Sequence, residues 1–96
     1  MPEASHTMHL DHASLRVTEW TLPPGGATGA HRHGYDYLVV PITHGLLRAV
    51  GADGVHETPL VPGKPYFRAA GVEHDVINAG EASLTFIEVE LKEHPG

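Results

Sequence analysis

Glycine and proline are spread so evenly along this chain that few segments could form a helix. The sequence holds 11 Gly and 8 Pro, and between Pro23 and Gly80 the longest stretch that lacks both is residues 72–79. Either residue destabilises the interior of a helix, and an average helix needs about 11 residues. The chain is therefore expected to form short strands that are joined by turns.

The segments between these turn residues have the composition of strands. Residues 14–22, 35–43 and 84–91 are rich in apolar and β-branched side chains, which favour strands. The segment Gly51-Ala52-Asp53-Gly54 predicts a hairpin, because Asp-Gly favours a tight turn. Further strands are expected at residues 28–33, 46–50, 55–60, 66–68 and 74–77. This spacing predicts an all-β fold of two packed antiparallel sheets, either a sandwich or a small barrel.

The length of 96 residues and the hydrophobic fraction of 41% fit one small domain. We expect this domain to span residues 1–96, with a barrel core at about residues 14–91. Residues 1–10 and 92–96 are expected to be loosely held tails. A domain this small buries only somewhat over ~60% of its unfolded surface, so a metal ion or a second subunit would help to stabilise it.

Charge and cysteine content exclude several classes of function. The net charge of −6 argues against nucleic-acid and anionic-membrane partners, because no basic patch is available. The chain has no cysteine, which excludes disulfides and thiolate chemistry and favours the reducing cytoplasm. No apolar run approaches the ~20 residues of a membrane span, and we expect no signal peptide. The expected partners are a small molecule and a second copy of the chain, which would cover Leu15, Val17 and Trp20.

Histidine is the unusual residue, with nine copies against six of lysine and arginine together. His31 and His33 are two apart, so in a strand both imidazoles would project from one face and could bind one divalent ion. Seen alone, this pair and the isolated His74 are equally compatible with solvent-facing or structural histidines. No role is assigned to His6, His9, His12, His44, His56 and His94.

The order and spacing of these histidines resemble the two sequence motifs of the cupin family. The first motif is matched by Gly25, five residues, His31-Arg32-His33 and a closing Gly45. The second is matched by Gly63, five residues, Ala69-Ala70-Gly71, two residues, His74, three residues and Asn78, with Ala69 where the family has proline. The resemblance implies a cupin double-stranded β-helix, which is a small jelly-roll barrel.

The resemblance also implies that His31, His33 and His74 hold one divalent transition metal, which could be Fe, Ni, Zn, Mn or Cu. The sequence departs from the family at the glutamate ligand, because Tyr37 and Leu38 occupy the two positions where it is expected. Tyr37 shares a face with His33 if the strand is regular, and is either a core aromatic or a group that hydrogen-bonds near the metal. The neighbouring Asp36 would face the site only across a bulge, and both are kept as candidates for the fourth group.

Some cupin dioxygenases are similar in using three histidines without glutamate. The resemblance therefore implies a mononuclear metal dioxygenase, or a related metal-assisted enzyme, that acts on a small acidic or enolisable compound. Arg32 and Arg68 could bind a carboxylate of that compound or could be solvated surface charges. Two alternatives remain open: a non-enzymatic module that binds or senses a small ligand, and a sugar or keto-acid isomerase. The isomerase would need a base, for which Asp36, Glu88 and Glu90 are available.

Overall fold

The computed structural model describes residues 3–92, which form nine strands and no helix. The expected all-β fold is thus confirmed, and no helix among the described residues could cross a membrane. The strands are β1 (Ser5–Asp11), β2 (Leu15–Leu22), β3 (His31–Arg32), β4 (Asp36–Pro41), β5 (Gly45–Gly51), β6 (Gly54–Leu60), β7 (Tyr66–Arg68), β8 (Glu73–Asn78) and β9 (Leu84–Leu91).

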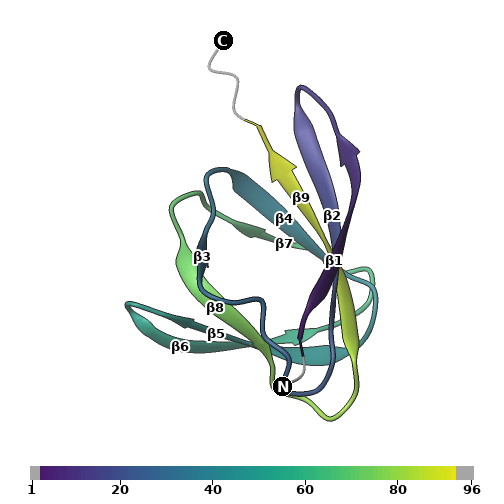
Figure 1. Cartoon of the computed structure of the whole chain (residues 1–96), viewed down its shortest axis with the longest axis vertical. Helices are drawn as coiled ribbons and strands as arrows, with labels where there is room; N and C mark the ends of the chain where they lie inside the picture. The colour runs from purple at the N-terminus through teal and green to yellow at the C-terminus, as the bar shows by residue number, and fades with distance from the viewer. Residues whose placement is uncertain (1–2, 93–96) are drawn as a thin grey trace.

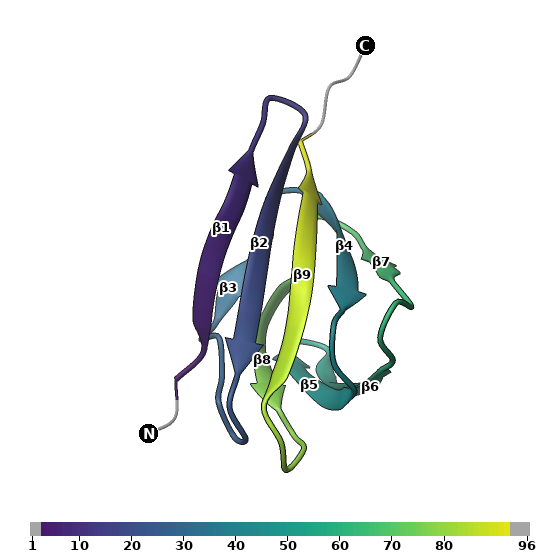
Figure 2. The ribbon, with the colours of Figure 1, turned by 90° about the vertical axis from the view of Figure 1, so that its right-hand side faces the viewer.

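The strands form two antiparallel sheets that pack face to face (Figure 1). One sheet has the order β1-β2-β9-β4-β7, and the other has the order β3-β8-β5-β6. The two sheets lie close together at the lower right of Figure 1 and diverge toward the left, where β3 is located. Figure 2 shows the five-stranded sheet in front, with β3, β8 and β5 behind it. We call the end where the two sheets lie close together the closed end of the barrel, and the end near β3, where they diverge, the open end.

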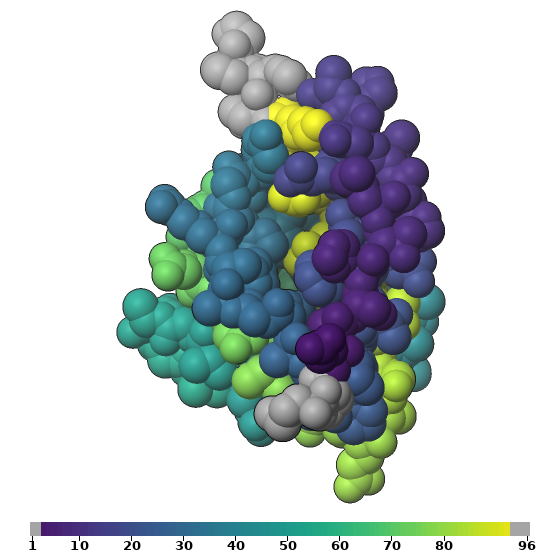
Figure 3. Space-filling model, in the orientation of Figure 1, coloured from purple at the N-terminus to yellow at the C-terminus, as the bar shows by residue number. Residues whose placement is uncertain are grey.

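Residues 5–10, which we expected to belong to a loose tail at residues 1–10, instead form most of a strand. Ser5–Asp11 forms the edge strand β1 and pairs with β2 from Ser5↔Thr21 to Asp11↔Arg16. In Figure 3 this strand, in purple, forms the right-hand rim of the molecule. All its residues are exposed, so its place depends on backbone hydrogen bonds and not on an apolar face. Such a strand leaves no hydrophobic periodicity in the sequence, and residues 1–2 and 93–96 lie outside the described part.

The predicted strand boundaries agree with the structure to within a few residues. Strand β4 ends at Pro41, although β4 is an inner strand that lies between β9 and β7. Strand β7 pairs with β4 only as far as Val39↔Tyr66, so no ladder on that side needs an N–H from Pro41. The carbonyl of Pro41 accepts a hydrogen bond from Gly63 N at 3.1 Å.

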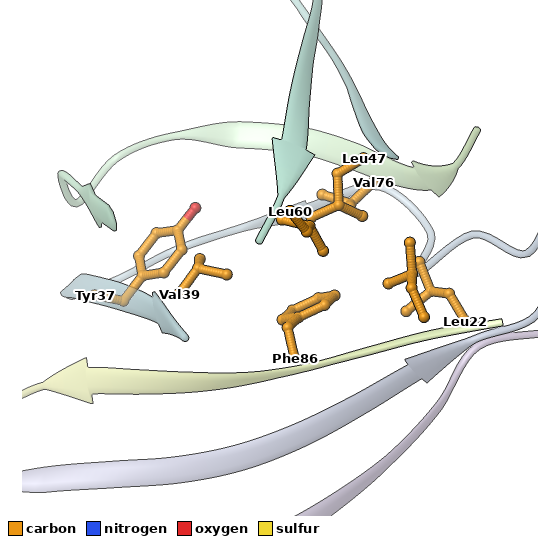
Figure 4. Close-up of a cluster of buried hydrophobic side chains, with 8 residues drawn as sticks. Leu22, Tyr37, Val39, Leu47, Leu60, Val76 and Phe86 are labelled. Carbon is orange, nitrogen blue, oxygen red and sulfur yellow. The ribbon is translucent and has the colours of Figure 1, made fainter. Parts of the chain in front are cut away.

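The hydrophobic core lies between the two sheets and extends from Leu22 to Tyr37 (Figure 4). Leu22 and Leu84 are fully buried, and Phe86 lies between Leu22 and Val39 in Figure 4. At the closed end, the Asn78 side chain joins the end of β2 to the turn between β8 and β9: its amide donates to the carbonyls of Leu22 (2.9 Å) and Ala82 (2.8 Å), and its Oδ1 accepts from Gly80 N. The asparagine of the second motif is therefore a structural residue.

A glycine of the first motif is also explained by packing at the closed end. A Cβ on Gly45 would lie 3.0 Å from Cδ2 of Leu84, so the Leu84 side chain would have to shift by a few tenths of an ångström. Gly45 begins β5 and Leu84 begins β9, so the absence of a side chain at Gly45 lets the two sheets approach closely here. The motif residues thus divide into those that close the barrel and the histidines, which lie at its other end.

Candidate metal centre

The structure brings His31, His33 and His74 together at the open end of the barrel. His31 on β3 is paired in register with His74 on β8, and His33 follows β3 directly. The Nε2 atom of His33 lies 3.0 Å from Nε2 of His31 and 3.1 Å from Nε2 of His74. One ring nitrogen of each residue lies within 4.8 Å of the other two. Three imidazole nitrogens thus converge on one point.

The hydrogen bonds around His31 fix which of its nitrogens faces this point. Nδ1 of His31 lies 2.8 Å from the carbonyl oxygen of Gly29, so Nδ1 carries the hydrogen and Nε2 presents a lone pair to the cluster. The Gly29 N–H in turn donates to Oδ1 of Asp75 at 3.1 Å. Asp75 therefore holds the loop that positions His31.

Burial keeps the other two histidines neutral. Burial, together with the neighbouring imidazoles, lowers the pKa of His33 to about 4, and His33 is only 6% exposed. The pKa of His74 is lowered to about 4 by burial first, then by His31 and by the positive charge of Arg68. Neutral imidazoles are the form that binds a transition metal. The donor set, with converging lone pairs and a carbonyl behind one ring, therefore fits a divalent ion of the Fe–Zn series.

Tyr37 faces this cluster, whereas Asp36 does not. The Tyr37 ring stacks on the His33 ring with centroids 3.9 Å apart, and burial raises the Tyr37 pKa well above its ordinary value. The phenol is thus neutral, and it lines the cavity below the histidines. The β4–β9 register is regular at Asp36, whose Oδ1 accepts a hydrogen bond from Ala70 N at 2.7 Å. Asp36 therefore fastens the loop before β8.

The carboxylate closest to the cluster comes from the last strand. Oε2 of Glu88 on β9 lies 4.0 Å from Nε2 of His33, and Oε1 accepts a hydrogen bond from Trp20 Nε1 at 3.2 Å. Burial and the nearby Glu90 raise the pKa of Glu88 to about 7. Sequence reasoning considered Glu88 only as a base for the isomerase alternative. The alternation of Phe86, Glu88 and Glu90 would have placed Glu88 on the inward face with the core residue Phe86.

The remaining acidic candidate is occupied elsewhere. Glu90 forms a salt bridge with Arg16, with Nε of Arg16 2.8 Å from Oε1 of Glu90 and Nη2 3.1 Å from Oε2. Both residues lie in the same row of the five-stranded sheet as Tyr37. Glu90 thus neutralises Arg16, and Glu88 is the carboxyl group beside His33.

A cavity of about 40 Å³ lies inside the barrel, and His74 is the member of the histidine cluster that lines it. Its walls are mostly apolar, and the polar groups come from Tyr37, Thr58, Tyr66, Arg68, His74 and Glu88. This volume holds only a few water molecules, so a ligand that enters it must be small. A groove of about 470 Å³ shares His74 and Arg68 with the cavity and lies outside it, beside the β5–β6 hairpin.

Sequence comparison agrees with this architecture: the family described as "Cupin domain" matches residues 18–90. The chain is a cupin. It is 50% identical over 91 residues to "Beta-alanine degradation protein BauB" of Pseudomonas aeruginosa, a match that covers 95% of this cupin and 96% of that protein. The resemblance that the two histidine motifs indicated is therefore confirmed.

Solved structures show the same fold. The crystal structure of a cupin domain from Bordetella pertussis Tohama I superposes with a TM-score of 0.92 at 44% identity, and the match covers 96% of each chain. The Cupin_2 domain of an XRE family transcriptional regulator from Enterobacter cloacae has a TM-score of 0.75 at 16% identity, covering 95% of this cupin and 98% of that domain. The second likeness shows the fold alone.

Proposed function

We propose that this cupin binds one divalent transition metal through His31, His33 and His74 and uses it to act on a small acidic or enolisable compound. The observation that carries the proposal is the convergence of three Nε2 atoms on one point, with distances of 3.0 and 3.1 Å from His33 to the other two. A metal bound there would act as a Lewis acid toward a carbonyl or enol oxygen and, if it were iron, could support a mononuclear dioxygenase reaction.

The surrounding residues would position the substrate and limit its size. Tyr37 holds the His33 ring by stacking and presents a neutral phenol to the cavity. The apolar walls contributed by Val39, Leu47 and Phe86 exclude water around the reacting carbon atoms. The relative named for β-alanine degradation supports a three-carbon amino acid, or the oxo acid left by removal of its amino group, as the compound class.

Metal analysis and oxygen uptake test this proposal. Purified protein should bind about one equivalent of Zn(II), Co(II) or Fe(II), and His74→Ala should not. The Fe(II)-loaded protein should consume oxygen with a three-carbon oxo acid. Stoichiometric metal without turnover would leave the non-enzymatic ligand-binding alternative, and wild-type protein that binds no divalent metal would refute the proposed function.

The position of Glu88 favours a second candidate, a keto-acid isomerase. Its carboxyl group lines the same cavity as His74 and lies beside His33, where it could take a proton from the carbon next to a carbonyl group. Exchange of that hydrogen in D₂O, followed by NMR without oxygen, would distinguish the two reactions. The exchange should be lost in Glu88→Gln.

We also propose that the protein is a cytoplasmic homodimer. The absence of cysteine supports a reducing compartment, and the exposed edge strand β1 carries Met8 (55% exposed) and Leu10 (49% exposed). The apolar residues first considered for the interface divide between two faces: Trp20 points inward to Glu88, whereas Leu15 and Val17 lie on the other face of β2. Sedimentation that shows a monomer at tens of micromolar would refute the dimer.

A further inference from the structure

The position of Arg68 beside the cavity sets it apart from the other lysine and arginine side chains of residues 3–92. Among residues 3–92, the salt bridges of lysine and arginine pair Arg16 with Glu90, Arg48 with Glu57 and Lys92 with Asp11. Arg68 forms no such pair, although the chain has twice as many acidic as basic residues. It lines both the cavity below His74 and the groove outside it, whereas Arg32 and Lys64 line neither.

The neighbours of Arg68 hold its guanidinium at the mouth of the cavity. Arg68 is paired in register with Tyr37, so both side chains leave the sheet on its inward face. The guanidinium lies over the Tyr66 ring at 4.6 Å from its centroid. Nη1 donates to the carbonyl of Phe67 at 3.3 Å, and Nη2 lies 3.5 Å from Oγ1 of Thr58. These contacts orient a planar cation at the mouth of the cavity, and its remaining N–H groups are available to a ligand.

We infer that Arg68 is the specificity residue that binds the carboxylate of the substrate while the other end of the molecule reaches the histidine cluster. This inference rests on the proposed function and narrows its substrate class to small monocarboxylates with an oxygen function two or three carbon atoms away. A guanidinium binds a carboxylate through two parallel hydrogen bonds, which is stronger and more directional than binding by water. The cavity volume of about 40 Å³ excludes long chains.

The test compares an acid with its neutral amide on matched variants. The probes are 3-hydroxypropanoate and 3-hydroxypropanamide, which have the same shape but differ in charge. Binding is measured by calorimetry for wild type, Arg68→Gln, Arg68→Lys and the control Arg32→Gln, an arginine that is exposed on β3 away from the cavity. Each protein is examined both metal-free and loaded with Co(II), and the Co(II) affinity is measured separately.

Arg68→Gln should weaken binding of the acid about tenfold or more, because charge-assisted hydrogen bonds are lost, and should leave binding of the amide unchanged. The affinity of Arg68→Lys for the acid should lie between those of wild type and Arg68→Gln, and the affinity of Arg32→Gln should match that of wild type. The Co(II) affinity should be the same in all four proteins, which keeps the metal site and the carboxylate site separable. Equal affinity of wild type and Arg68→Gln for the acid, or no binding of the acid by wild type in either form, would overturn the inference. Wild type that binds no Co(II) but binds the acid through Arg68 would refute only the proposed function.

Discussion

The two ends of the barrel are built from different kinds of residue. At the closed end, β2, β6 and β9 contribute Leu22, Leu60 and Leu84, each at most 2% exposed. At the open end, β4, β8 and β9 contribute Tyr37, His74 and Glu88. Strand β9 thus supplies a core leucine to one end and a carboxyl group to the other. Apolar burial therefore dominates at one end and polar chemistry at the other.

This separation has a physical cost at the open end. Burying a neutral histidine or a carboxyl group stabilises the fold less than burying a leucine does. The packing of the closed end must therefore hold in place the strands that carry these polar groups. The comparison predicts that substitutions at each end affect different measurements. The four predictions that follow test this, beginning with the largest effect.

His33→Ala should abolish stoichiometric metal binding. Structural metal ions contribute ~10 kcal/mol or more through their ligands together, so the loss of one of three donors should weaken binding by about a thousandfold. His56→Ala is the control, because that histidine is exposed on β6, where its Nε2 lies 3.4 Å from Oδ2 of Asp53. Equilibrium dialysis of a divalent metal measures the affinity. If His33→Ala bound the ion as tightly as wild type, the assignment of the metal site to the open end would be wrong.

Leu84→Ala should destabilise the fold by about 3 kcal/mol and leave the metal stoichiometry of the folded protein unchanged. Leu84 is fully buried and contacts Gly45, so its removal leaves a cavity between the sheets. Chemical denaturation measures the loss, and the half-exposed Leu10 provides the control, since Leu10→Ala should change stability by less than about 0.5 kcal/mol. If folded Leu84→Ala could no longer bind metal, the two ends would not be independent.

Glu88→Gln should change how stability depends on pH. The pKa of Glu88 is raised to about 7 in the folded protein, so the native state holds this proton more tightly than the unfolded chain does. Its contribution to stability is complete below the unfolded pKa of ~4.5 and is lost as the pH rises through about 7. Glutamine keeps the acceptor for Trp20 without the charge, so the metal-free variant should gain about 2 kcal/mol relative to wild type between pH 5 and 8.

Denaturation of both metal-free proteins at several pH values measures this difference. The lowered pKa values of His33 and His74 act in the opposite direction, because their contribution is present above pH ~6.5 and is lost as the pH falls through about 4. These histidines are the same in both proteins, so their effect cancels in the comparison. Glu57→Gln, at an exposed glutamate of β6, is the matched control. If the difference in unfolding free energy between wild type and Glu88→Gln were the same at every pH in this range, Glu88 would not be buried as a protonated acid.

Tyr37→Phe should have the smallest effect. The aromatic ring that stacks on His33 remains, so the metal affinity should change by less than about threefold and the stability by less than about 1 kcal/mol. Binding of small acids should weaken modestly, because the phenol that faces the cavity is removed. Tyr37→Leu loses the stacking and should reduce metal affinity further. Equal metal affinities in the two variants would show that the ring does not position His33.

Much of this molecule could be predicted from short-range features of the sequence. The Gly51–Gly54 hairpin and the final strand at residues 84–91 were located because turn residues and apolar segments are local signals. The histidine cluster was expected because two motifs occur in order. Strand β1 could not be found, since an exposed strand has no pattern of burial.

The position of Glu88 beside His33 could not be predicted, because these two residues are far apart in the sequence. Glu88 lies near His33 because β9 is placed between β2 and β4, and no spacing along the chain encodes that neighbourhood. The search for the missing carboxylate therefore remained near His33 in sequence, at Asp36 and Tyr37. Parity along β4 separated those two residues, but it could not indicate the strand that supplies the acid.

All three histidines belong to two adjacent segments that are joined by their own backbone bonds. Thr28 N donates to Val76 O at 2.9 Å, and His33 N donates to Val72 O at 2.9 Å, so the ladder brackets the cluster on both sides. Most of the cavity walls come from other strands, namely β4, β5, β6, β7 and β9, whereas β8 contributes Val76 and His74 itself. The site is thus partly modular. Apart from Tyr37, which stacks on His33, wall residues on the other strands can change without altering the segments that carry the ligands, so one ligand geometry could serve successive substrates as those walls diverge.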